Sequence, residues 1–367
     1  MIDTGNARCL EIKDVSKKFG AVTAVDHLSL YVEQGQIFSL LGPSGCGKTT
    51  TLRLVAGLET VDQGEVLLNG KIVNDIPAHK RECSTVFQTL ALFPHMTVEQ
   101  NIAYGLERRK VAKKEIIRKV ARMLDLVQLL GMEKRRPSQI SGGQRQRVAL
   151  ARSLVLEPKI LLLDEPLSSL DRKLRKEMTI ELKRVQREVG ITFLYVTHDQ
   201  KVALSMSDRI AVMSKGKIEQ IDTAQGIYEV PKTYFVAEFM GAVNIFRCRL
   251  ASRSGEKMYF ETEEGMKILA AMCTGVCAEK ATGISVHPEL IELSPIGTKI
   301  ANKNVFKGKI AEMNYQGDCI EVKLAYHDSK NPITVSLSNR IRGQSLYKVG
   351  EEVLFHWEAD GSNVLTD

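Results

Sequence analysis

The chain has 367 residues, which is more than one hydrophobic core usually organises, so its length predicts two domains. Hydrophobic residues make up 44% of the chain and charged residues 26%, an ordinary balance for a globular protein. No apolar run approaches the ~18 residues that cross a bilayer, and the first residues lack the basic and apolar regions of a signal peptide. We therefore expect the chain to act in the cytosol.

Seven scattered cysteines, an odd number, favour reduced thiols over a disulfide framework. Cys273 and Cys277 form the one close pair, and we expect no metal there because no histidine or further cysteine accompanies them. The net charge is +7, and much of the local excess lies at 107–124, where apolar residues at helical spacing predict an amphipathic helix with a solvated basic face. We expect no nucleic-acid partner because only 6% of the residues are aromatic; anionic lipid headgroups are a second option.

The first part of the chain has the pattern of a wound α/β domain. Alternating apolar residues predict a half-buried strand at 26–32, and Asn69-Gly70 within 64–73 predicts a hairpin with φ > 0 at both turn residues. Short apolar runs without alternation are typical of parallel strands buried on both faces, and they occur at 36–41, 84–87, 159–164 and 192–197. A parallel sheet with a small antiparallel layer is the expected result.

The pattern changes near residue 240, where we expect the boundary between an N-terminal domain, 1–240, and a C-terminal domain, 241–367. Short alternating segments follow at 244–250, 257–262, 283–287, 307–315, 319–326, 332–338 and 351–357. The turn residues that separate them include Gly255, Gly283, Gly317 and Asp328. This spacing predicts a small all-β barrel or sandwich.

The stretch 42–49, GPSGCGKT, matches G-x-x-x-x-G-K-[ST] at every fixed position and lies between a buried strand and a helix-like segment. In such a loop the backbone N–H groups and the helix N-terminus bind phosphate, Lys48 reaches the β and γ phosphates, and Thr49 ligates Mg²⁺. The residues expected to bind the nucleotide here are Gly42, Pro43, Ser44, Gly45, Cys46, Gly47, Lys48, Thr49 and Thr50.

Cys46 lies inside this loop, close to Lys48 and to the helix N-terminus, and both favour a thiolate. We therefore expect an alkylating reagent to inactivate the protein and MgATP to protect it. A buried, inert thiol is the alternative.

The stretch 159–166, KILLLDEP, runs from apolar residues into two acids at the expected carboxyl end of a strand, where ligands of wound α/β sheets bind. Asp164 is expected to hold the Mg²⁺ shell. Glu165, one residue on and pointing the other way, is expected to polarise the attacking water as general base.

At 140–154, ISGGQRQRVALARSL, the chain resembles the ATP-binding subunits of ABC transporters, with Ile140 in place of the usual leucine. The resemblance covers essentially the whole chain. It implies an α/β P-loop NTPase domain with antiparallel β and helical subdomains, followed by a small all-β, OB-like domain of TOBE type. It also implies a homodimer in which each ATP lies between the P-loop of one chain and the signature motif of the other. The signature residues expected at that second anion site are Ser141, Gly142, Gly143 and Gln144.

The resemblance assigns roles to four further residues. Phe19 stands where an aromatic ring stacks on adenine, and Gln88 where a glutamine contacts metal or water and links to the helical subdomain. Asp171 matches the loop that crosses the dimer interface. His198 matches the switch histidine that holds the γ-phosphate, whereas a lone Phe or His is more often structural.

One ATPase domain followed by a β domain, without membrane helices, resembles the ATPases of bacterial importers for maltose, iron and above all polyamines such as spermidine and putrescine. This implies an ATP-hydrolysing motor, peripheral at the cytoplasmic face of the inner membrane, that drives integral permease subunits and, indirectly, an external solute-binding protein. Ferric iron, 2-aminoethylphosphonate and sugar are alternative solutes. A soluble ABC ATPase uncoupled from transport and a ligand-sensing β domain are more remote alternatives. His287 stands where relatives carry arginine, which weakens any ligand assignment in the β domain.

Overall fold

The computed structural model describes residues 7–241, 243–255, 257–271, 280–301, 303–326, 331–338 and 347–366. Cys273, Cys277 and Asp328, named above, lie outside these residues. The chain forms two compact units, 1–224 and 225–367, and each is described by itself. The boundary expected between residues 240 and 241 stays a prediction.

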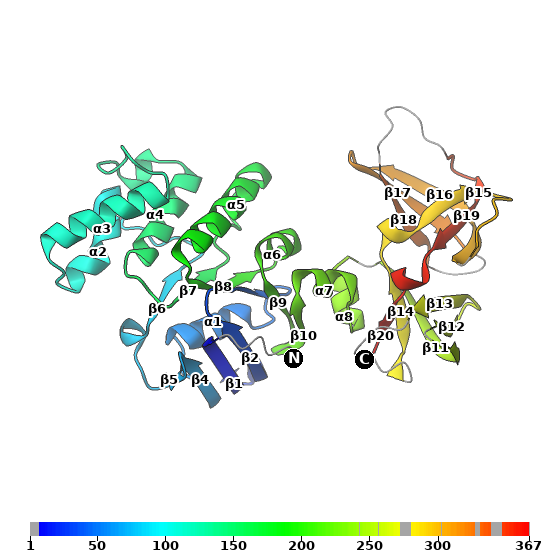
Figure 1. The fold of residues 1–367 in the computed structure, drawn as a ribbon, viewed down its shortest axis with the longest axis horizontal. Coiled ribbons are helices and arrows are strands. Elements are labelled where there is room, and N and C mark those ends of the chain that lie inside the picture. Colours follow the sequence, from blue (N-terminus) through cyan, green and yellow to red (C-terminus); the bar gives the residue numbers. More distant parts are fainter. Residues whose placement is uncertain are drawn as a thin grey trace. The chain divides into compact units, whose positions relative to one another are not determined.

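The first unit contains two sheets (Figure 1). Their strands are β1 (Arg8–Phe19), β2 (Val22–Glu33), β3 (Ile37–Leu41), β4 (Gln63–Leu68), β5 (Lys71–Ile72), β6 (Cys83–Val86), β7 (Ile160–Asp164), β8 (Thr192–Thr197), β9 (Arg209–Ser214) and β10 (Lys217–Thr223). The smaller sheet is antiparallel with the order β2-β1-β4-β5, and the larger has the order β10-β9-β3-β8-β7-β6. Within the larger sheet the neighbours from β9 to β6 run parallel, which confirms the predicted wound α/β arrangement.

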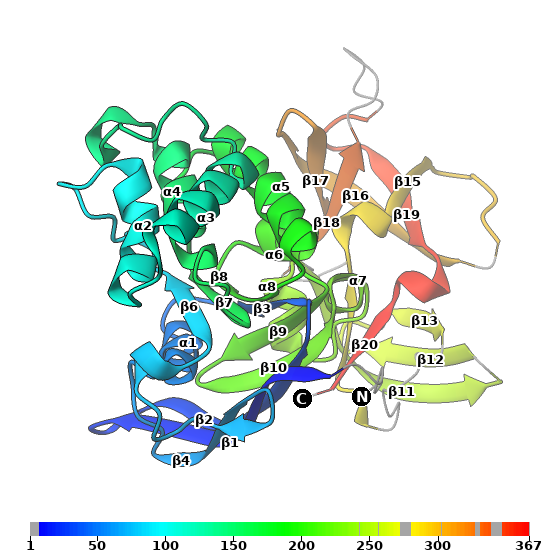
Figure 2. The same ribbon diagram turned by 60° about the vertical axis from the view of Figure 1, so that its left-hand side comes forward.

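The helices of the first unit are α1 (Lys48–Ala56), α2 (Val98–Arg108), α3 (Lys113–Leu126), α4 (Gly142–Leu154), α5 (Arg172–Val189) and α6 (Gln200–Met206). Figures 1 and 2 both show α2, α3 and α4 grouped together, away from the small sheet. The parallel strands are buried on both faces: Leu161 and Phe193 belong to one apolar core, whereas their neighbours Leu162 and Leu194 belong to the other. Each face therefore excludes water, as the unbroken apolar runs predict.

Two local predictions in this unit have different outcomes. Asn69 and Gly70 have φ of 49° and 74° between β4 and β5, so the predicted hairpin turn is confirmed. The single helix predicted over 107–124 is wrong at its start, because α2 ends at Arg108 and α3 begins at Lys113. Lys110, with φ of 56°, takes the left-handed conformation that separates the two helices.

The second unit contains the short helices α7 (Ala224–Glu229) and α8 (Tyr234–Phe239) and two five-stranded antiparallel sheets. The sheets have the orders β13-β12-β11-β14-β20 and β15-β19-β16-β17-β18. Their strands are β11 (Asn244–Ser254), β12 (Lys257–Thr262), β13 (Lys267–Ala271), β14 (Gly283–Val286), β15 (Glu292–Pro295), β16 (Asn304–Tyr315), β17 (Cys319–Ala325), β18 (Ile333–Ser338), β19 (Glu352–Trp357) and β20 (Asn363–Leu365).

One apolar core joins these two sheets, with Phe246, Phe260, Phe355 and Trp357 among its buried residues. All seven alternating segments form strands, which confirms the predicted all-β domain. Gly283 is a correction, because it begins β14 instead of a turn. A Cβ there would lie 2.2 Å from the Tyr234 hydroxyl, so close packing is what requires a glycine.

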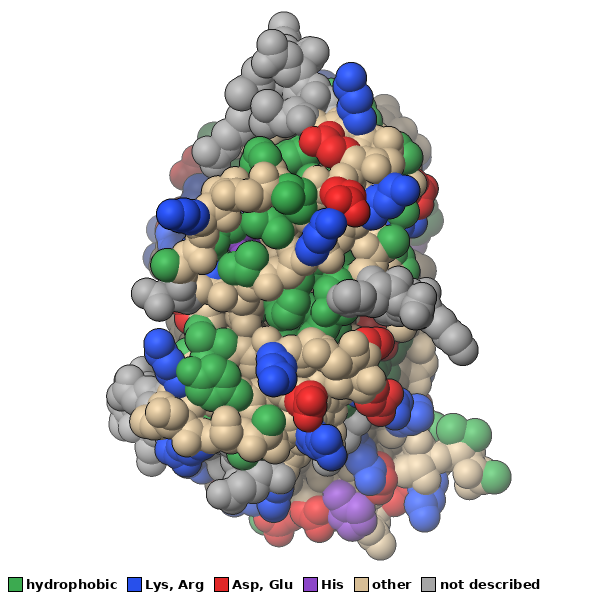
Figure 3. Space-filling view, turned by 90° about the vertical axis from the view of Figure 1, so that its right-hand side faces the viewer, with side chains coloured by type: hydrophobic (Ala, Val, Ile, Leu, Met, Phe, Trp, Pro, Cys, Tyr) green, Lys and Arg blue, Asp and Glu red, His purple; other side chains and the backbone are tan. Residues whose placement is uncertain are grey.

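The face drawn in Figure 3 carries basic and acidic side chains interspersed with apolar ones. On this face the lysines and arginines do not gather into one basic surface. Within the described ranges, no helix combines the length and the apolar character that a membrane span requires.

Arg81 is a buried cation that holds the carboxyl end of α1. Its guanidinium donates to the carbonyls of Leu54 and Val55 at 2.7 and 2.9 Å, and to those of Ile76 and Asn74 at 2.8 and 3.2 Å. Helix C-termini present carbonyls without helical partners and favour positive charge. Arg81 therefore fixes the end of the helix that begins at Lys48.

We predict that Arg81→Leu destabilises the chain by about 2–4 kcal/mol, because it removes a buried cation that donates to four backbone carbonyls, among them that of Val55. Urea unfolding followed by circular dichroism measures the loss. Lys80→Leu is the matched control, since Lys80 is exposed, and it is expected to change the free energy of unfolding by less than about 0.5 kcal/mol. Equal effects of the two substitutions would contradict the role given to Arg81.

Candidate active site

The loop 42–49 packs against backbone on two sides. A Cβ on Gly47, whose φ is 105°, would lie 2.3 Å from the carbonyl oxygen of Ala24 in β2. A Cβ on Gly42 would lie 2.3 Å from the carbonyl oxygen of Met213 in β9. Only glycine fits at these two positions, so the loop can follow the backbone of both strands.

Lys48, the first residue of α1, is almost fully buried, with 5% of its surface exposed. Its ammonium donates to the carbonyls of Gly42 and Pro43, both at 2.8 Å, and lies 3.6 Å from the Cys46 sulfur. The loop thus holds a positive charge inside its own turn. Such a charge, beside a helix N-terminus, is suited to phosphate.

Thr49 and Asp164 meet between α1 and the end of β7. The Thr49 hydroxyl donates to Asp164 Oδ1 at 2.9 Å. Burial raises the pKa of Asp164, the Thr49 hydrogen bond opposes this, and the neighbouring Glu165 raises it further. A hydroxyl and a carboxylate oxygen at this distance are ligands of the kind that Mg²⁺ prefers, so the donor set fits the ion.

Glu165 and His198 form a pair at the carboxyl ends of neighbouring strands. His198 Nδ1 lies 3.0 Å from Glu165 Oε1, and the Glu165 N–H donates to the Val196 carbonyl at 3.0 Å. Strand alternation is not what orients Glu165, because β7 ends at Asp164 and Glu165 has φ of 45°. This conformation is rare for a non-glycine residue, and such strain is concentrated at functional sites.

Gln88 reaches the same region through Ser168. Its amide donates to Ser168 Oγ at 3.3 Å, and the Ser168 hydroxyl donates to the Glu165 carbonyl at 2.9 Å. Gln88 therefore connects to the backbone of the proposed base through one serine. Ser168 carries no recognisable signal in the sequence.

Several residues beside the loop come from segments distant in the sequence. A cavity of about 340 Å³ is lined by loop and α1 residues, by Glu165, and by Val22, Thr23, Ala24, Lys215 and Gly216. The Gly216 N–H donates to the Cys46 carbonyl and the Asp26 N–H to the Gly216 carbonyl, each at 3.0 Å. Lys215-Gly216 is recognisable in the sequence as a turn, but only the order of the strands reveals that this turn lies beside the loop.

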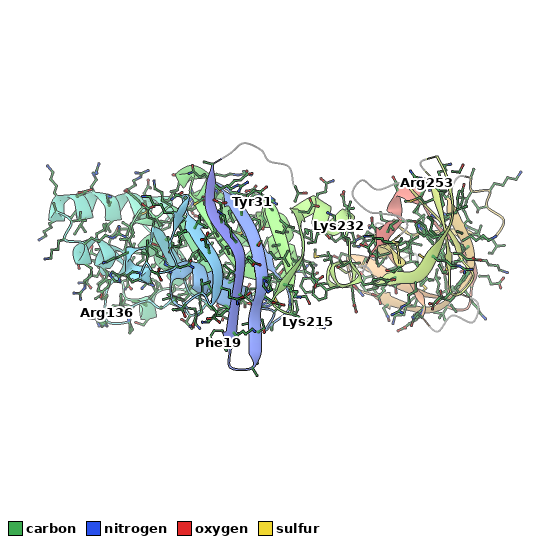
Figure 4. All side chains as sticks on the ribbon, turned by 90° about the horizontal axis from the view of Figure 1, so that it is seen from below. Phe19, Tyr31, Arg136, Lys215, Lys232 and Arg253 are labelled. Atoms are coloured by element: carbon green, nitrogen blue, oxygen red, sulfur yellow. The ribbon has the colours of Figure 1, made fainter. Side chains whose placement is uncertain are left out.

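The predicted loop residues Ser44, Gly45, Gly47, Lys48, Thr49 and Thr50 line this cavity. Phe19 lies at the end of β1, is 46% exposed, and pairs in register with Val22. Figure 4 shows Phe19 toward the same end of the β1–β2 pair as Lys215, with Tyr31 toward the other end.

The signature residues form a helix start elsewhere in the unit. Ser141 is the N-cap of α4: its hydroxyl accepts from the Gln144 N–H at 3.3 Å, and Gln144 Oε1 accepts from the Ser141 N–H at 2.8 Å. Asp171 caps α5 by accepting from the Leu174 N–H at 3.0 Å. Of the residues that the structure describes around the loop cavity, none comes from the signature or from Asp171.

The reactive thiolate expected at Cys46 is wrong. The side chain is 4% exposed, and burial raises the pKa of the thiol more than Lys48 lowers it. The sequence showed the nearby cation but not the burial that outweighs it.

Comparisons with known proteins agree with this geometry. The family model described as ABC transporter matches residues 25–168, and the model described as TOBE domain matches residues 284–365. The chain is similar to cbiO1 from Clostridium perfringens, part of the ABC transporter complex cbiONQ, with a TM-score of 0.57, 26% identity, and coverage of 61% of this chain and 91% of that one. It is also similar to the dimeric structure of a post-hydrolysis state of the ATP-binding cassette MJ0796 bound to ADP and Pi, with a TM-score of 0.53, 31% identity, and coverage of 59% and 99%.

The chain therefore belongs to the family of ABC transporter ATP-binding proteins, and it is an ABC-type ATPase. The sequence is also similar to one particular kind of protein within this family. It is 44% identical over 359 residues to the spermidine/putrescine import ATP-binding protein PotA of Rubrobacter xylanophilus, with coverage of 97% of this chain and 93% of that protein. It is 43% identical over 357 residues to PotA of Pseudomonas aeruginosa strain UCBPP-PA14, with coverage of 97% and 98%.

We predict that Glu165→Gln slows ATP hydrolysis at least about 100-fold and leaves ATP binding intact, because it removes the base without altering the phosphate loop. Phosphate release and equilibrium ATP binding measure the two effects separately. Glu177→Gln makes the same chemical change at an exposed position of α5 and is the control. Hydrolysis by Glu165→Gln at the unaltered rate would show that Glu165 is not the base.

We predict that Cys46 resists iodoacetamide in the native chain at neutral pH and reacts faster as the pH rises. The raised pKa of the thiol keeps the reactive thiolate scarce until higher pH. Mass spectrometry of the peptide that contains Cys46 gives its rate of modification, and the denatured chain is the control. Rapid modification of the native chain near pH 7 would contradict the buried thiol.

Proposed function

We propose that this chain is the ATP-hydrolysing motor subunit of a binding-protein-dependent importer of polyamines, spermidine or putrescine. The observation that carries the proposal is its similarity, at 41–51% identity, to PotA proteins across both units. Ferric iron, 2-aminoethylphosphonate and sugar are the alternative solutes, because the solute contacts the membrane subunits and an external binding protein rather than the ATPase.

At the phosphate end, Lys48, the loop backbone and the N-terminus of α1 bind the triphosphate. Thr49, Asp164 and Gln88 hold Mg²⁺, which when bound withdraws charge from the phosphate oxygens. The contact of 2.9 Å between Thr49 and Asp164 supports this assignment, because both oxygens already converge on one point.

Glu165 takes the proton of the attacking water, and His198 orients the Glu165 carboxylate. His198 Nδ1 donates to Glu165 Oε1, which fixes the carboxylate, and Nε2 donates to the γ-phosphate, because both groups facing the ring are acceptors. The contact between Glu165 and His198 at 3.0 Å supports this role. Phe19 stacks on adenine.

Ser141, Gly142, Gly143, Gln144 and Asp171 act on the nucleotide of a second chain. A single chain keeps the signature helix apart from its own loop cavity, so a head-to-tail homodimer completes each site. ATP binding closes this dimer and hydrolysis reopens it. Domain closure of this kind is the movement that the motor delivers.

The membrane partner engages the helical part of the first unit. A groove of about 730 Å³ lies along α2 and α3, and two of its apolar side chains, Ile117 and Leu130, are 63% and 61% exposed. Such a groove suits the apolar face of a short helix. We assign it to a cytoplasmic helix of the permease, which places the chain at the cytoplasmic face of the inner membrane.

Uptake measured with the membrane subunits that co-purify with the chain tests the proposal. Proteoliposomes that contain the complex, ATP inside and binding protein outside are expected to accumulate radiolabelled spermidine or putrescine, and the complex with Glu165→Gln is expected to accumulate neither. Maltose, ferric iron and 2-aminoethylphosphonate are the competing solutes. Accumulation of one of these instead of a polyamine would overturn the assignment of polyamines as the solute. Failure of any membrane protein to co-purify would overturn the proposed role in transport.

A further inference from the structure

Lys17 is a lysine with little contact with water. Only 9% of its side chain is exposed, and its ammonium donates to Asp62 Oδ1 at 2.8 Å and to Thr60 Oγ1 at 3.3 Å. Asp62 accepts a second hydrogen bond, at Oδ2, from the Lys18 N–H at 2.7 Å. These two hydrogen bonds hold the pKa of Asp62 below its ordinary value, and the bond from Lys17 has the larger effect. The position of the Lys17 charge is therefore fixed.

This fixed charge lies against Phe19. The Lys17 nitrogen is 5.4 Å from the centroid of the Phe19 ring, which is within the range of a cation–π contact. Phe19 nevertheless keeps 46% of its surface exposed and pairs with Val22, which lines the loop cavity. Lys17 thus covers part of a ring that otherwise remains exposed to solvent.

The contact changes what the open part of the ring can bind. A cation attracts the π electrons of an aromatic ring, whose faces carry negative charge. Two electron-rich rings that stack face to face repel each other, and drawing density toward Lys17 reduces that repulsion on the opposite face of Phe19. A purine base is itself electron-rich, so we expect its stacking on Phe19 to be strengthened in this way.

We propose that Lys17, held in place by Asp62, strengthens the stacking of Phe19 on the purine base of the nucleoside triphosphate. Lys17 is a positioning residue in this scheme, because it acts on the base only through the Phe19 ring. The proposal rests on the proposed function, in which ATP is the substrate and Phe19 contacts adenine. The proposal therefore attributes part of the affinity for the purine base to the ion pair of Lys17 and Asp62, which lies outside the phosphate loop.

Binding of ATP and of inorganic tripolyphosphate, each with Mg²⁺, separates this role from a purely structural one. The full chain carries Glu165→Gln to prevent turnover, and isothermal titration calorimetry gives both dissociation constants. Lys17→Met is expected to weaken ATP binding about three- to fivefold, the size of an ordinary cation–π contact, and to leave tripolyphosphate binding within about twofold. Lys18→Met, which removes the adjacent exposed charge, is the control.

Two further variants complete the test. In a chain that already carries Phe19→Leu, Lys17→Met is expected to have no additional effect on ATP binding. Lys17→Arg keeps a cation that can make the same contact with an aromatic ring and is expected to bind ATP within about twofold of the parent. Equal weakening of both ligands, unchanged ATP binding in Lys17→Met, or a loss in Lys17→Arg as large as in Lys17→Met would overturn the proposal.

The proposed function can fail separately. If the parent chain does not bind ATP, the motor itself is wrong. If it binds ATP but Phe19→Leu changes nothing, the motor stands, whereas the stacking by Phe19 and the role of Lys17 are both wrong.

Discussion

The site depends on one steric constraint, the contact of the phosphate loop with the backbone of β2 and β9. At Gly42 and Gly47 the neighbouring carbonyls leave no room for a Cβ. Because the loop is fixed on both sides, Lys48 is enclosed by the carbonyls of its own turn, and Thr49 points at Asp164. The hydrogen bonds of Gly216 to the loop and to β2 extend the same constraint to the turn between β9 and β10.

The order of the parallel sheet then brings the acidic groups to this loop. β3, which leads into the loop, lies beside β8, and β8 lies beside β7. The carboxyl ends of β7 and β8 therefore deliver Asp164, Glu165 and His198 to one edge. Asp164 and Glu165 are partly buried there, whereas the His198 side chain is 51% exposed.

Much of this could be predicted from local sequence pattern. The loop motif, the buried strands and Asn69-Gly70 each have a short-range physical cause, and the structure contains them. What could not be predicted depends on contacts between distant segments. The burial of Cys46, the place of Lys215 beside the loop and the close packing at Gly283 arise only when separate segments of the chain meet. The end of α2 within 107–124 was missed because apolar spacing alone does not mark a left-handed residue such as Lys110.

The central claim is that the loop of one chain and the signature of another share a nucleotide, and a mixed dimer tests it most directly. One chain carries Lys48→Ala and the other Gly142→Asp, a position where a Cβ meets nothing closer than 3.8 Å, and both carry Glu165→Gln. The carboxylate repels the γ-phosphate, so each mutant homodimer is expected to fail, whereas the mixed dimer rebuilds one complete site. ATP retained per dimer after rapid desalting is expected to exceed that of both homodimers; retention no higher than theirs would contradict the shared site.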